Sequence, residues 1–250
     1  MLPKIDVPIY DIKLISCKKP VKFRPFLVKE QKLLLMAQEN NTDDKDYVLN
    51  IVKQIINNCL ITEINVDELP MFDIEYLFLN LRARSMGEVV NLNYRCANQI
   101  TDSVTGTEEP GKTHNCNNIV NFDINLLNIK PKIEKEHTNK IEINENLGLL
   151  MKYPNLETFK DIDFSGGDVV LTTIFSCIDA IYDAETIYYT KDVDKKELEE
   201  FVDGLPASVV EKIKNFFDTM PKIKETIHFK CNKCQYEEDI FVEGLDSFFG

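Results

Sequence analysis

The sequence predicts an α+β protein in which helices pack with short antiparallel hairpins, two of them joined by a zinc-ribbon-like cysteine site. Segments of helical periodicity alternate with short strand-like segments, and two pairs of cysteines fall at strand ends. With 250 residues, the chain can bury a sizeable core without disulfides. Its hydrophobic fraction of 44% and charged fraction of 28% are typical of globular proteins.

Composition and proline placement suggest three segments. We expect an extended N-terminal arm over residues 1–28, where prolines favour edge strands and open backbone. A helical half with the first cysteine hairpin follows over 29–130. In the second half, 131–250, we expect further helices and a C-terminal Cys-x-x-Cys hairpin. The alternative that the two halves pack as one domain stays open. A composition break over 130–138 favours a linker.

The first half contains three expected helices. Periodicity predicts helices over 28–39 and 46–60. A third begins near Pro70 and is apolar on nearly all sides until Arg82, which predicts a central helix. Gly87 is placed to end it in a left-handed cap. A strand over 89–94 then leads to Cys96.

The second half repeats the order of helix, helix, strand, cysteine and strand. A strand over 118–124 completes the first hairpin, and short strands are expected over 140–144 and 149–153. We further expect helices over 167–181, 194–203 and 206–219, then strands over 223–230 and 236–242.

Four cysteines carry the strongest chemical signal. Cys231 and Cys234 lie between two alternating segments, which places both thiols at a hairpin tip where a tetrahedral ion can bind. Cys96 and Cys116 lie at the end of one strand and the start of the next, separated by a polar excursion. If that excursion is an insertion in a second knuckle, the four sulfurs converge on one structural zinc ion.

Other interpretations of these thiols stay open. His114 could replace a cysteine as ligand, and the four thiols could be free in a reducing cytoplasm. A redox Cys-x-x-Cys should open a helix, whereas a strand pattern follows Cys234. Cys59 and Cys177 fall on apolar helix faces and are expected to be small buried hydrophobes.

Composition argues against several classes of function. The net charge of −13 disfavours a broad nucleic-acid face and an anionic membrane surface. No apolar segment is long enough to span a bilayer, and no signal peptide is visible. The three histidines form no metalloprotease pattern, and no phosphate-binding glycine loop is present. We therefore expect neither an enzyme nor a small-molecule substrate.

Two blocks of sequence carry a resemblance to a known family. One is the run Leu69-Pro-x-x-Asp-x-x-Tyr-Leu-x-x-x-Leu-Arg-x-x-Ser-x-Gly-Glu88, followed by a strand and Cys96. The other is Phe216-Phe-x-x-Met-Pro221, a strand, Cys231-x-x-Cys234, a strand and Gly244-Leu-x-x-Phe-Phe249. The chain resembles the baseplate protein family of T-even-type contractile-tailed bacteriophages.

This resemblance implies a structural or assembly role in the hub region of a tail baseplate. The partners would be other baseplate or tail proteins, and the protein would be assembled in the host cytoplasm and located in the virion. Arg82, Phe248 and Phe249 are the candidate interaction residues. Two alternatives stay open: a phage zinc-ribbon factor in transcription or replication, and an assembly chaperone absent from finished particles.

Overall fold

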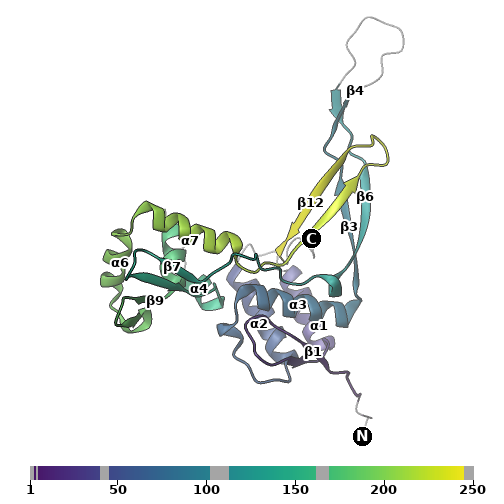
Figure 1. Cartoon of the computed structure of the whole chain (residues 1–250). Coiled ribbons are helices and arrows are strands. Elements are labelled where there is room, and N and C mark those ends of the chain that lie inside the picture. The colour runs from purple at the N-terminus through teal and green to yellow at the C-terminus, as the bar shows by residue number, and fades with distance from the viewer. Residues whose placement is uncertain (1–2, 4, 40–44, 102–112, 162–168, 245–250) are drawn as a thin grey trace, which may run out of the picture.

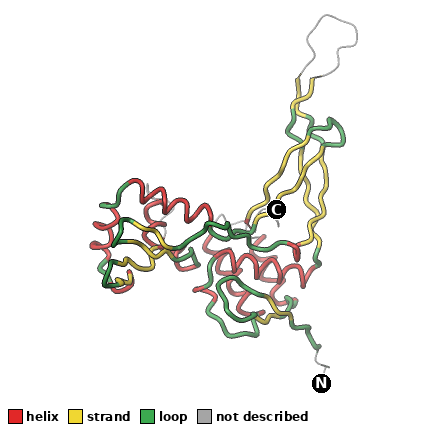
Figure 2. The backbone as a smooth tube through the Cα atoms, viewed as in Figure 1, coloured by secondary structure: helices red, strands yellow, loops and turns green. Residues whose placement is uncertain are grey.

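The computed structural model describes residues 3, 5–39, 45–101, 113–161 and 169–244. Within these residues, helices and short antiparallel strand pairs form three regions (Figures 1 and 2). We call them the helical body, the side lobe and the twin ribbons, which project away from the helical body. The predicted α+β class is confirmed.

The helical body is formed by three helices and one short hairpin. The helices are α1 (Val28–Glu39), α2 (Lys45–Cys59) and α3 (Met71–Met86), close to the ranges predicted. The strands β1 (Tyr10–Ile12) and β2 (Val21–Phe23) pair antiparallel. A 3-10 turn, η1 (Val66–Glu68), precedes α3.

The first hairpin belongs to the core of the helical body. Ile12, Leu14, Val21 and Phe23 are all buried against the helices. The carboxylate of Asp73, in the first turn of α3, accepts hydrogen bonds from the backbone N–H groups of residues 15 and 16, at 2.9 and 2.8 Å. This part of the segment expected to be an extended arm is therefore fixed to the helices.

The side lobe is a four-stranded antiparallel sheet covered by helices. Its strand order is β10-β9-β8-β7. The strands are β7 (Lys140–Glu142), β8 (Gly148–Met151), β9 (Ile178–Tyr182) and β10 (Ile187–Tyr189). The helices are α4 (Leu156–Asp161), α5 (Val169–Cys177), α6 (Lys195–Asp203) and α7 (Ala207–Thr219), with the 3-10 turn η3 (Thr190–Asp192).

The sequence prediction for residues 167–181 was wrong in its second part. The helix ends at Cys177, and the chain continues directly as the central strand β9. Ile178, Ala180 and Ile181 are buried there. A short apolar run fits a buried strand as well as a buried helix, so periodicity alone could not separate the two.

The twin ribbons are two antiparallel strand pairs of equal length. In the first ribbon β3 (Val89–Arg95) pairs with β6 (Ile119–Asn125), and in the second β11 (Lys224–Lys230) pairs with β12 (Glu237–Glu243). A small hairpin of β4 (Gln99–Thr101) and β5 (Thr113–Asn115) extends the first ribbon, and η2 (Leu126–Asn128) follows β6. Figure 1 shows the two ribbons side by side.

The base of the twin ribbons is anchored on α3. Leu79 and Ala83 of α3 share a buried cluster with Ile124, Ile223 and residue 242 of the ribbon strands and their flanks. Gly87 ends α3, as predicted, but its φ of 114° and ψ of 148° are extended rather than the left-handed cap expected. This conformation is open essentially to glycine, and it turns the chain directly into β3.

Candidate metal centre

The tips of the twin ribbons are two knuckles of the same construction. The second knuckle is the continuous segment 231–236. The first consists of residues 96–98 and 116–118, with residues 99–115 inserted between its third and fourth positions. Each knuckle therefore has a cysteine at its first and fourth positions. The excursion in the first hairpin is an insertion into a Cys-x-x-Cys knuckle.

Backbone hydrogen bonds support this equivalence position by position. The N–H of Cys96 donates to the carbonyl of Asn118 at 2.8 Å, and the N–H of Cys231 donates to the carbonyl of Tyr236 at the same distance. The fifth residue of each knuckle has a positive φ, 52° at Asn117 and 62° at Gln235.

That fifth residue also donates to the carbonyl of the first cysteine in both knuckles, at 3.1 and 2.9 Å. In the first knuckle, an additional bond from the N–H of Cys116 to the carbonyl of Asn98, at 2.8 Å, closes the base of the insertion.

The four thiols converge on one point between the two knuckles. The Sγ atoms of Cys96 and Cys234 are 3.7 Å apart and those of Cys116 and Cys231 are 3.8 Å apart, and all four lie within 4.8 Å of one another. A disulfide would need about 2.05 Å. Four sulfurs at about 2.3 Å from a tetrahedral zinc ion are separated by about 3.8 Å, so the spacing fits a metal site.

Two asparagines of the first knuckle reach the thiols of the second. Nδ2 of Asn98 donates to Sγ of Cys234, and Nδ2 of Asn118 donates to Sγ of Cys231, both at 3.6 Å. Asn118 also donates to Oδ1 of Asn232 at 2.6 Å. These bonds tie the knuckles together. They also place the partial positive charge of an N–H group beside sulfurs that must be thiolates to bind a metal.

The protonation of the thiols differs between the knuckles. Burial opposes ionisation of Cys231, but backbone N–H groups of residues 234 and 233 and the neighbouring thiols lower its pKa to about 6. Burial raises the pKa of Cys96 to about 12. The surroundings of the second knuckle therefore favour the thiolate form more than those of Cys96 do, and a bound cation would favour loss of the Cys96 proton.

Comparison with known proteins identifies the family. A model of the family described as "T4 bacteriophage base plate protein" matches residues 7–250. The chain belongs to this family. The match covers nearly the whole chain, and it includes both ribbons and the side lobe.

One relative of the chain is the baseplate hub assembly protein gp26 of Enterobacteria phage T4. It is 28% identical over 254 residues, which cover 98% of this chain and 97% of that protein. No solved structure matches the chain. The resemblance stated from the sequence and the structural baseplate role that it implied are confirmed, and the comparisons do not support the alternative of a transcription or replication factor.

The other sequence-predicted residues fall in different places. His114 lies on β5 and is not part of the four-thiol cluster. Cys59 and Cys177 are buried, as expected from their helix faces. Arg82 is half-buried on α3, fourteen residues before Cys96, and is not part of the cluster. Phe248 and Phe249 lie outside the described residues.

The sequence did not indicate how the ribbons pack against each other. Phe229 of β11 is fully buried, and its ring centroid lies 4.9 Å from that of Tyr94 and 6.0 Å from that of Phe122. The hydroxyl of Tyr94 also donates to Glu238 at 3.1 Å. Strand alternation can place such side chains on one face of each strand, but no local signal pairs one ribbon with the other.

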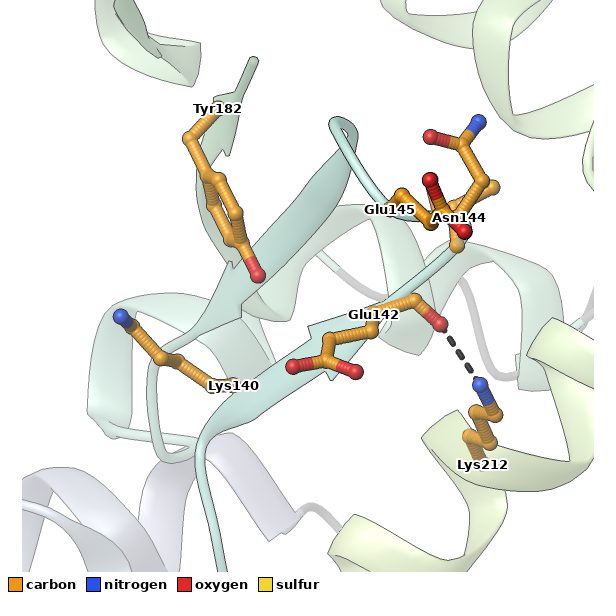
Figure 3. Close-up of a pocket in the computed structure, with 7 residues that line it drawn as sticks. Lys140, Glu142, Asn144, Glu145, Tyr182 and Lys212 are labelled. Carbon is orange, nitrogen blue, oxygen red and sulfur yellow. Dashed lines mark hydrogen bonds between the residues drawn. The ribbon is translucent and has the colours of Figure 1, made fainter. Parts of the chain in front are cut away.

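A polar pocket in the side lobe offers no comparable chemistry. It lies beside the β7–β8 turn and α7, and several of its polar side chains have partners within the lobe (Figure 3). Lys212 donates to the carbonyl of Glu142 at 2.7 Å, and Oδ1 of Asn144 accepts backbone bonds within the turn. The Lys140 ammonium lies 5.6 Å from the ring centroid of Tyr182.

No helix in the described part of the chain combines the length and apolar character needed to cross a membrane.

Proposed function

We propose that the chain is a non-catalytic component or assembly factor of the baseplate hub. The observation that carries this proposal is the alignment with a baseplate hub assembly protein over almost the full length of both chains. A match of that extent includes all three regions of the fold, so it supports a shared role of the whole molecule. The role would be carried out through contacts with other baseplate or tail proteins.

One structural zinc ion, held by Cys96, Cys116, Cys231 and Cys234, completes this proposal. The sulfur spacing and the hydrogen bonds from Asn98 to the cluster support it. Four protein ligands leave no open coordination position, so the ion would stabilise structure and would not activate a substrate. It would hold the tips of both ribbons in one rigid projection.

The place of action follows from the same reasoning. The protein would assemble in the host cytoplasm and occupy the tail baseplate of the virion. Its net charge of −13 favours solubility before its partners arrive and disfavours nucleic acid as a partner.

Loss of the chain should stop baseplate assembly at the hub. In cells infected by a phage that cannot produce it, we expect incomplete tails, with assembly restored when the wild-type chain is supplied. Mass spectrometry of purified virions then separates a permanent subunit from a factor that leaves. Normal baseplates without the chain, or its retention on nucleic acid at physiological salt, would contradict the proposal.

Phe248 and Phe249 are proposed as further contact residues on the basis of the sequence alone. Deletion of residues 245–250 should weaken binding to baseplate intermediates more than it lowers the melting temperature. If the shortened chain unfolds outright, the two phenylalanines belong to the core instead.

A further inference from the structure

Arg82 lies one turn before the C-terminal end of the central helix α3 and makes no hydrogen bond or ion pair with the described residues. Its neighbours Leu81 and Ala83 are buried, and Arg82 itself is half-buried. Its Nη1 atom is shielded from solvent and has no hydrogen-bond partner. Burial lowers the pKa of the guanidinium below its ordinary value, which reflects the cost of removing this charge from water.

Two other arginines, the half-buried Arg24 and the exposed Arg84, have partners within the chain. Arg24 donates to Glu30 at 3.0 Å and to the carbonyl of Asn58 at 2.7 Å. Arg84, two residues after Arg82, pairs with Glu88 at 2.8 Å and lies over the ring of Tyr10. The chain has 42 acidic residues, yet none of the ion pairs among the described residues includes Arg82.

The surface next to Arg82 is apolar. Met86 follows one turn later on the same face of α3 and is 52% exposed. Val89, where α3 gives way to β3, is 56% exposed. A desolvated guanidinium beside exposed apolar side chains has the composition of an interface core, in which arginine is enriched.

An uncompensated cation in such a place costs stability in the isolated chain. The cost is recovered if another molecule supplies an anion, because guanidinium and carboxylate form paired, charge-assisted hydrogen bonds. We propose that the C-terminal end of α3, at Arg82 and Met86, together with the start of β3 at Val89, docks a baseplate protein, and that an aspartate or glutamate of that protein pairs with Arg82. This inference rests on the proposed function and names the chemistry of one contact.

The test compares R82M, R82K and the matched control R84M in the full chain. Because R82M removes a charge without a partner, its melting temperature should equal or exceed that of the wild type. R84M removes a satisfied pair and should melt at the same or a lower temperature. A lower melting temperature of R82M would overturn the inference, since the cation would then be satisfied within the chain.

The second measurement is co-sedimentation with hub-stage intermediates isolated from cells infected by a phage that does not produce the chain. We expect R82M to associate at least about 30-fold more weakly than the wild type, R84M to associate normally, and R82K to fall between them. Equal association of R82M and the wild type would overturn this inference alone. If the wild type fails to associate, the proposed function fails as well.

Discussion

The two ribbons share one knuckle and differ in almost everything around it. Both knuckles have the same six positions, the same pair of backbone hydrogen bonds and the same positive φ at the fifth residue. The first tolerates a whole hairpin between its third and fourth positions, and the second is continuous. The convergence of the four thiols therefore depends on six positions per ribbon, and we expect the proposed metal site not to depend on the loop that joins them.

The outward faces of the ribbons show the same contrast. On the second ribbon, a cross-strand ion pair joins Lys230 to Glu237 at 2.6 Å, and a cross-strand hydrogen bond joins Nδ1 of His228 to Oδ1 of Asp239 at 3.0 Å. On the first, the outward residues are uncharged for the most part, and Asn91 donates to Asp123 at 2.9 Å. The inner faces and the tips are constrained by packing and by sulfur, whereas the outer faces are free to differ.

The largest expected effect comes from removing one ligand in either ribbon. Cys96→Ser and Cys231→Ser should each abolish metal binding and lower the melting temperature by a similar amount, because each leaves a three-sulfur site. Metal content per chain and thermal unfolding measure this, with Cys17→Ser as the control. A Cys96→Ser variant that keeps its metal would break the equivalence of the two knuckles.

Packing between the ribbons should produce the next largest effect. Phe229→Ala should lower the free energy of unfolding by about 3–5 kcal/mol, because the ring is fully buried between the ribbons. Phe241, on the outward face of the same ribbon, is 75% exposed, and its replacement by alanine should change stability by no more than about 0.5 kcal/mol. Denaturant unfolding compares the two, and similar small changes would show that the ribbons do not depend on each other.

A smaller effect is expected from the asparagine donors. Asn118→Ala should weaken metal binding about 10- to 100-fold by removing a hydrogen bond to the sulfur of Cys231. Competition with a chelator measures the affinity. Asn121, exposed on the outward face of the first ribbon, provides the control, and equal affinities of the Asn118 and Asn121 variants would rule out this role.

The smallest effect on metal binding is expected from removing the insertion, although this is the largest change in sequence. Deletion of residues 99–115, with Asn98 joined to Cys116, should leave one metal ion bound per chain. The hydrogen bond between these two residues already holds them together at the base of the insertion. Metal analysis of the shortened chain checks this expectation, and loss of the ion would show that the insertion supports the site.

The sequence predicted the parts of this molecule whose signals are local. Helical periodicity located α1, α2 and α3, and strand alternation around Cys231 located the second knuckle. Strand β9 was missed because its apolar run follows an apolar helix without a break. The contacts of Asn98, Asn118 and Phe229 depend on how distant segments meet, and no local pattern reports that.

The central claim is that the four thiols at the ribbon tips bind a single zinc ion. It is tested most directly by the metal content of the full chain, purified under reducing conditions without added metal. We predict one zinc ion per chain, and that Cys234→Ser lacks it. A wild-type chain with well under one zinc ion would contradict the claim.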